Sequence, residues 1–171
     1  MVIFKVSKTI VVEDPAKKIA LANEIAPGAV APDGFDTEAF TVGMRAVKYK
    51  EKAGQHLIML SEFPAPKQKS PDLSTALKDY RAKQDALNHA VVDKESTPEM
   101  ATHLGPIQVL QRQVHFPDGK TKIDFLVMAQ NPKLPNKQII IIADAPVAPE
   151  EDGKFLADYL SHLDIAPWIA P

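Results

Sequence analysis

The segment from residue 138 to 163 constrains the fold more than any other part of the chain. It opens with four consecutive isoleucines, Ile139 to Ile142, between polar flanks. Successive side chains of a strand point to opposite faces of a sheet, and β-branched residues favour strands. The run therefore predicts a strand that is covered on both faces. After a turn at Pro146, the acidic and amphipathic segment from Pro149 predicts a helix that supplies one of the covers.

Two further helices are predicted from capping signals. Asp14 followed by Pro15 predicts a helix start, and the helix is expected to end near Ala26, before Pro27 and Gly28. The run Ser70-Pro71-Asp72 predicts the start of the longest helix, with Ser70 as the cap and an end at 88–92. Its predicted apolar stripe consists of Leu73, Leu77, Tyr80, Leu87 and Val91, with Ala76 and Gln84 between them.

Alternating apolar residues predict the remaining strands. The predicted strands are 2–12, 40–50, 56–63, 107–116, 121–130 and 137–143. The alternation in 40–50 changes phase near Arg45, which indicates a β-bulge. The segments 29–36 and 131–136 are predicted to be loops, and the polar segment 93–101 a loop or a single turn, because all three contain proline and little apolar periodicity.

The turn Pro117-Asp118-Gly119 is the clearest hairpin signal in the chain. A two-residue loop would place Arg112 opposite Phe125 and would gather the apolar residues of both strands on one face. A loop one residue longer would place Arg112 opposite Asp124 and would mix apolar and polar residues. We predict the first register, because a shift of one residue moves every side chain to the other face.

Short links between the strands predict an α+β fold with one mainly antiparallel sheet of five to six strands and helices packed on both faces. The order of elements over about 35–163 ends in a strand hairpin, the isoleucine strand and a helix that carries Phe155-Leu156 and Tyr159-Leu160. This order resembles the PsbP/Mog type of domain. The resemblance implies an assembly, binding or accessory factor more than an enzyme, although a fold does not by itself determine function.

Length and composition indicate a globular protein. The 171 residues fit a single domain, 1–171, in which the strand segment 2–12 and the tail 165–171 are peripheral. A net charge of −2 argues against a specific nucleic-acid binder, and no apolar run is long enough for a transmembrane segment. Because strand-like sequence follows Met1 directly, we expect an extracytoplasmic protein whose leader or membrane anchor was removed, with a cytoplasmic protein as the alternative.

The residues that carry most enzyme chemistry are missing or dispersed. The chain has no cysteine, which excludes disulfides, thiol nucleophiles and thiolate metal sites. Its five histidines lack metal-ligand spacing, its seven glycines are scattered, and no Gly-x-Ser-x-Gly elbow is present. We therefore predict no catalytic residue, no cofactor and no metal. Asp118 is expected to be a turn residue, and Asp144 is the acid placed best for a function.

The predicted hairpin from residue 40 to 63 carries a basic cluster formed by Arg45, Lys48, Lys50 and Lys52. Such a cluster could bind an acidic protein or an anionic surface. The alternative is a solvated strand face whose lysines protect a sheet edge from pairing. Lys67 and Lys69 follow in a connector and add to the positive charge.

The tail from Ile165 to Pro171 contains Trp168, the only tryptophan of the chain. An exposed tryptophan beside two isoleucines would indicate a site for a partner. We instead favour a tail that packs back onto the domain, because burial of Trp168 can offset much of the entropy cost of ordering.

These observations favour a non-enzymatic binding or accessory domain, with Arg45, Lys48, Lys50, Lys52 and Trp168 as a possible partner surface. The alternative is a small-molecule hydrolase or ligand-binding enzyme with a site near Asp144 and the basic hairpin. A cleft with convergent polar groups and shifted pKa values would favour an enzyme or ligand site, and a flat patch would favour a protein partner.

Overall fold

The computed structural model describes residues 10–41, 45–54, 56–64, 72–134, 137–145 and 149–168. The helices are α1 (Pro15–Ile25), α2 (Leu73–Ala76), α3 (Lys78–Asn88) and α4 (Pro149–Leu160). The strands are β1 (Phe35–Phe40), β2 (Ala46–Glu51), β3 (Leu57–Pro64), β4 (Val91–Ser96), β5 (Glu99–Thr102), β6 (Gly105–Gln108), β7 (Leu110–His115), β8 (Thr121–Gln130), β9 (Lys137–Ala145) and β10 (Ala166–Pro167). The predicted strand over 2–9, the Ser70 cap and the connector lysines lie outside the described residues.

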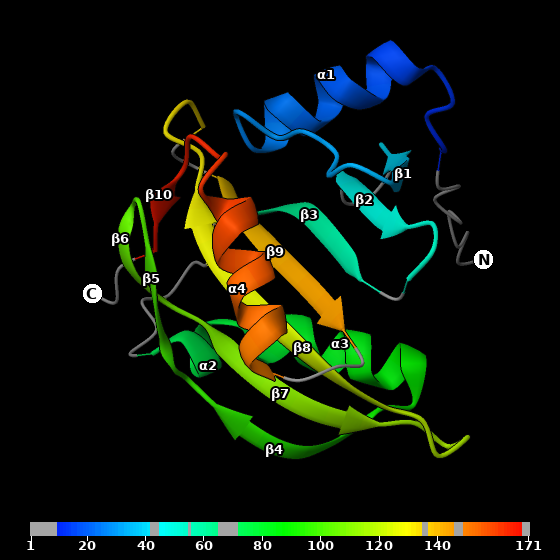
Figure 1. The fold of residues 1–171 in the computed structure, drawn as a ribbon, viewed down its shortest axis with the longest axis vertical. Coiled ribbons are helices and arrows are strands. Elements are labelled where there is room, and N and C mark those ends of the chain that lie inside the picture. Colours follow the sequence, from blue (N-terminus) through cyan, green and yellow to red (C-terminus); the bar gives the residue numbers. More distant parts are fainter. Residues whose placement is uncertain are drawn as a thin grey trace, which may run out of the picture.

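One antiparallel sheet organises the described chain (Figure 1). Its strands follow the order β1-β2-β3-β9-β8-β7-β4, and β10 adds to β8, while β5 and β6 form a separate hairpin. The isoleucine strand β9 lies between β3 and β8, so both of its edges are paired. The predicted α+β class is confirmed, and the eight strands of the sheet exceed the predicted five to six.

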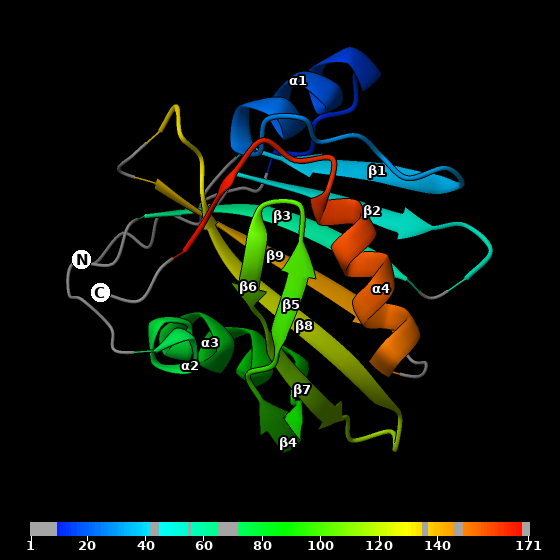
Figure 2. The same ribbon diagram turned by 60° about the vertical axis from the view of Figure 1, so that its left-hand side comes forward.

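Helices cover both faces of the sheet, as Figure 2 shows when the molecule is turned. Ile139 and Ile141 pack in one cluster with apolar residues of α1 and α4. Ile140 and Ile142 point the other way, into a cluster with Leu73, Leu77 and Tyr80 of the α2–α3 segment. The predicted opposite orientation of alternate isoleucines is confirmed, because a strand at the centre of a three-layer arrangement must bury both of its faces.

The N-terminal half begins with helix α1, which starts as predicted. The carboxylate of Asp14 accepts hydrogen bonds from the backbone N–H groups of Ala16 and Lys17. The predicted long strand over 40–50 is wrong, because Phe40 pairs with Ala46 in an antiparallel hairpin of β1 and β2. The change of phase near Arg45 therefore marks the connection between two strands and not a β-bulge.

Two other segments differ from the prediction. The predicted loop over 93–101 contains most of β4 and part of β5, although β4 is exposed along its whole length and carries no apolar alternation. The predicted longest helix is interrupted at Leu77, and Asp72 caps its first segment by accepting a hydrogen bond from the N–H of Thr75. Asp72 thus takes the capping role that the sequence assigned to Ser70.

The C-terminal tail returns to the domain. Ala166 and Pro167 form the short strand β10 beside β8, and the Trp168 N–H donates a 3.2 Å hydrogen bond to the carbonyl of Met128. The half-buried Trp168 side chain packs against the cluster around Leu73 and Ile140. The predicted docking of the tail is confirmed for the described part, which ends at Trp168.

We expect the tryptophan fluorescence of the native protein to be blue-shifted from that of free tryptophan, and Trp168→Ala to lower the free energy of unfolding by about 1–2 kcal/mol. This is less than the about 3–5 kcal/mol typical of a fully buried aromatic residue, because the ring is half-buried. Emission spectra and urea denaturation measure the two effects. Emission like that of free tryptophan, together with unchanged stability, would contradict a docked tail.

Candidate functional site

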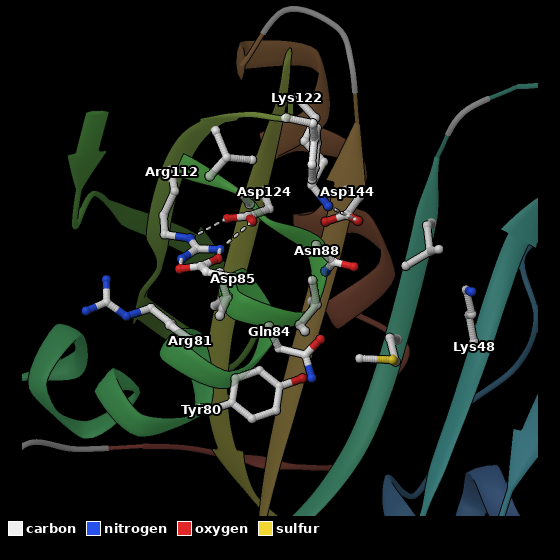
Figure 3. Close-up of a pocket in the computed structure, with 17 residues that line it drawn as sticks. Lys48, Tyr80, Arg81, Gln84, Asp85, Asn88, Arg112, Lys122, Asp124 and Asp144 are labelled. Atoms are coloured by element: carbon white, nitrogen blue, oxygen red, sulfur yellow. Dashed lines mark hydrogen bonds and ion pairs between the residues drawn. The ribbon is translucent and has the colours of Figure 1, made fainter. Parts of the chain in front are cut away.

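A polar cavity lies between helix α3 and the sheet, with a volume of ≈ 250 Å³. It is slightly smaller than the range of about 300–1,000 Å³ common for drug-sized ligands. Figure 3 shows the charged and amide side chains that converge on it from the helix and from the strands. The labelled lining residues are Lys48, Tyr80, Arg81, Gln84, Asp85, Asn88, Arg112, Lys122, Asp124 and Asp144.

The helix wall of the cavity is a stripe formed by Tyr80, Gln84 and Asn88. Residues four apart lie on the same side of a helix, so these three side chains share one face. The predicted apolar stripe is wrong in this half of the segment, because Leu87 is 75% exposed and Val91 lies in β4, 52% exposed. The segment therefore packs through leucines at its start and presents amides to the sheet at its end.

The sheet wall depends on the register of β7 and β8. Arg112 lies opposite Asp124, which is the pairing that the predicted register excluded, so that prediction is wrong. The loop has three residues, with Gly119 at a φ of +83°, and the carboxylate of Asp118 accepts a hydrogen bond from the N–H of Lys120. This register places Lys122, Asp124 and Arg112 on the face below α3 and confirms Asp118 as a turn residue.

Arg112 is held by two carboxylates, one from the sheet and one from α3. Its Nε and Nη2 donate to the two oxygens of Asp124 at 2.9 and 2.8 Å, and its Nη1 and Nη2 donate to Asp85 at 2.9 and 3.1 Å. Burial lowers the pKa of Arg112, but the hydrogen bonds that Arg112 donates to Asp124 and Asp85 outweigh this effect, so the pKa is raised. The arginine thus stays charged and links the helix to the sheet.

Asp144 lies opposite Asp124 on the neighbouring strand and forms an ion pair with Lys122. The Lys122 Nζ donates to Asp144 Oδ2 at 2.8 Å and lies 5.3 Å from the centre of the Phe116 ring. The other oxygen, Asp144 Oδ1, is buried and has no hydrogen-bond partner in the described structure. Burial raises the pKa of Asp144, and the attraction of Lys122 opposes this shift only in part.

Tyr80 and Ser61 add two buried hydroxyls that lie close to each other. Neither makes a well-formed hydrogen bond within the described residues. Burial raises the pKa of Tyr80 to about 12, and the interaction with the Ser61 hydroxyl opposes this shift. Tyr80 lines the cavity, and its ring is held edge-on against Phe63. Buried polar groups in proteins nearly always have a partner, so this site has unused capacity for a ligand or for water.

We expect Asp144 to titrate above about 3.9, the ordinary value for aspartate. The folded protein then holds the proton more tightly than the unfolded chain. The contribution of Asp144 to the free energy of unfolding therefore increases as the pH falls from the pKa of Asp144 in the folded protein towards about 3.9. Asp144→Asn removes this pH-dependent contribution. Carboxyl NMR titration measures the pKa directly.

Asp118 is the internal control for this titration. It is exposed in the hairpin turn, and the backbone N–H of Lys120 lowers its pKa. The two aspartates should therefore titrate on opposite sides of the ordinary value. An Asp144 that titrates at or below Asp118 would contradict the buried environment described for its carboxylate.

The residues of the predicted basic cluster lie on β2 and beside it, and several of them pair with acidic residues. Arg45 is held by Glu24 and Glu62, each at 2.7 Å, and Lys52 lies 3.5 Å from Asp36. Lys50 is exposed, whereas Lys48 lines the cavity, 3.8 Å from Glu38. The alternative role of protecting a sheet edge is wrong for the lysines of β2, because β2 lies between β1 and β3.

The structure brings together Asp144 and Lys48, which the sequence singled out, with several residues that it did not. Trp168 packs against the α2–α3 cluster, and the cavity is lined without it. The missed residues include Gln84, Asn88 and the pair Arg112–Asp124. One signal in the sequence could have revealed them. After Leu77, the positions at helical spacing change from leucine to amide residues, which makes the inward face of α3 polar.

The described residues carry neither a cluster of metal-ligating side chains nor a helix that could cross a membrane. They contain no group of three or more histidine, aspartate or glutamate side chains placed to hold a metal ion. None of the helices in these residues is long and apolar enough to cross a membrane.

Comparison with known proteins gives a distant likeness of fold. No protein-family model matches the chain, and no curated protein matches it. Among solved structures, it is similar to the Saccharomyces cerevisiae Ran-binding protein Mog1p, with 12% sequence identity, 91% of this chain and 90% of that chain covered, and a TM-score of 0.41. At this identity and TM-score the likeness assigns neither a family, a function nor a partner, and the resemblance to the PsbP/Mog type of domain stays a prediction.

Proposed function

We propose that the protein is a non-enzymatic binding domain and that the cavity below α3 is its recognition site. The observation that carries this proposal is the convergence of unused hydrogen-bonding groups on one cavity, with Asp144 Oδ1 and the Tyr80 hydroxyl as its buried members. Burying polar groups without partners is unfavourable for folding. A cluster of buried polar groups within an otherwise apolar domain is typical of a functional site.

The chemistry of the lining favours binding over nucleophilic hydrolysis. Of the described residues that line the cavity, none is histidine, cysteine, serine or threonine. Nucleophilic catalysis commonly uses such a side chain together with an adjacent base. General acid catalysis by Asp144 is the second candidate function, and the raised pKa of this residue is the observation that favours it.

The basic cluster is a weaker candidate for recognition. An acidic partner would compete with Glu24 and Glu62 for Arg45 and with Asp36 for Lys52. Exposed lysines also interact weakly with a partner at physiological salt. We therefore assign recognition to the cavity first and keep Lys50 as the exposed cation of a secondary surface.

The test is ligand mapping by NMR on the isotopically labelled protein. The probes are glycerol, acetamide, ethanolamine, glycine and acetate, which differ in charge and in hydrogen-bonding groups. We expect at least one probe to shift resonances of α3, β8 and β9, and Tyr80→Phe combined with Gln84→Leu to abolish these shifts. The control variant is Gln108→Ala, because Gln108 is exposed on β6 and lies outside the cavity.

Three outcomes separate the candidates. Shifts confined to the cavity and lost in the double variant support the binding site. Shifts confined to the β1–β2 hairpin, or the absence of shifts with every probe, would overturn it. Conversion of an ester or glycoside substrate that depends on Asp144 would favour the enzymatic candidate over the binding domain.

A further inference from the structure

We propose that the ligand of the α3 cavity is a neutral polyhydroxy molecule, either a polyol or a small saccharide. This inference rests on the proposed binding function and specifies the chemistry of its ligand. It is argued from three properties of the cavity, which are its compensated charges, its free hydrogen-bonding groups and its mixed polar and apolar walls.

The formal charges of the cavity already have partners. Arg112 is held by Asp85 and Asp124, and Lys122 pairs with Asp144 at 2.8 Å. Arg81 pairs with Glu95, and its guanidinium points away from Asp144 in Figure 3. Each of these charged groups therefore has a partner, although Arg112 is shared by two carboxylates. A charged ligand would have to compete with one of these ion pairs in a partly buried site, which is unfavourable.

The groups that remain free are suited to hydroxyls. Asp144 Oδ1 is a pure acceptor, and the Tyr80 hydroxyl both donates and accepts. The amides of Gln84 and Asn88 also do both, and neither side chain makes a hydrogen bond within the described residues. A hydroxyl matches every one of these groups because it carries one donor and two acceptor positions, whereas an ammonium only donates and a carboxylate only accepts.

The walls of the cavity fit the two kinds of surface that a sugar presents. Apolar side chains of Leu57, Met59 and Ile142 lie on the strands beside the polar groups. They offer a surface for the C–H groups of a polyol chain or sugar ring, while the amides and the carboxylate contact its hydroxyls. The volume of ≈ 250 Å³ corresponds to about eight water molecules at about 30 Å³ each, which suits a ligand of monosaccharide size.

Saturation-transfer NMR with glucitol and glucose tests this inference, against ethanolamine, acetate and acetamide as probes of other chemistry. A direct-contact measurement is needed, because polyols stabilise many proteins by exclusion from their surface without binding. We expect transfer to glucitol or glucose, and each of Gln84→Ala and Asn88→Ala to weaken binding by about tenfold through the loss of one or two hydrogen bonds. Gln108→Ala should leave binding unchanged, and native amide spectra should show that each variant is folded.

The outcomes separate this inference from the function on which it rests. Binding of ethanolamine, acetate or acetamide in the cavity that equals or exceeds that of the polyols would overturn the ligand class and leave the binding function standing. If saturation transfer to the polyols is unchanged in both Gln84→Ala and Asn88→Ala, the polyols bind outside the cavity. This result would overturn the inference. No binding by any probe would overturn both proposals.

Discussion

Replacing Arg112 with methionine is expected to lower the free energy of unfolding by about 3–5 kcal/mol, because it leaves buried carboxylates without their cation. The Arg112 and Asp124 side chains are 5% and 6% exposed, so solvent cannot replace the lost partner. Urea denaturation measures the loss.

Arg45→Met is the matched control for this experiment. Arg45 also contacts two carboxylates, but its side chain is 29% exposed, so the expected loss is about 0–1 kcal/mol. The double variant Arg112→Met/Asp124→Leu should recover much of the lost stability, because it removes the buried charge together with its partner. Equal losses for Arg112→Met and Arg45→Met would contradict a special role for the buried cluster.

Replacing Ile141 with alanine is expected to cost about 2–5 kcal/mol, and Ile140→Ala should cost a similar amount. The two side chains are 0% and 1% exposed, and they point into different clusters on opposite faces of β9. Each substitution therefore leaves a cavity under a different layer of helices. Thermal and urea denaturation measure the loss.

Ile19→Ala provides the control, because Ile19 lies on α1 and is 64% exposed. Its loss should stay within about 0.5 kcal/mol. Ile142→Ala should cost less than Ile141→Ala, since Ile142 is half-buried and lines the cavity below α3. A neutral effect at either Ile140 or Ile141 would mean that one face of the sheet does not carry a packed layer.

Local chemistry explains which parts of the fold could be predicted from the sequence. The Asp14 cap, the alternation in β8 and the isoleucines of β9 each act within a few residues, and their elements appear where predicted. β4 could not be recognised, because its side chains are all exposed and its only strand partner in the described chain is β7. Nothing in its own residues distinguishes such a strand from a loop.

The candidate site was only partly predictable because it depends on contacts between distant residues. Grouping the apolar residues on one face favoured the wrong register of β7 and β8. The sequence pattern of the two strands did not include the second carboxylate that pairs with Arg112. That partner, Asp85, comes from α3, a separate element. A buried arginine becomes acceptable only when both carboxylates are in place, and local patterns do not reveal this arrangement.

The central position of β9 has a consequence for synthesis of the chain. Leu60 of β3 pairs with Ile141 of β9, so β3 emerges from the ribosome long before its inner neighbour does. At about 5–20 residues per second, the inner edge of β3 waits on the order of ten seconds for its partner. During this interval Ile58 and Leu60, which are fully buried in the folded protein, lack their final cover. The nascent chain therefore passes through a period in which aggregation and chaperone binding compete with folding.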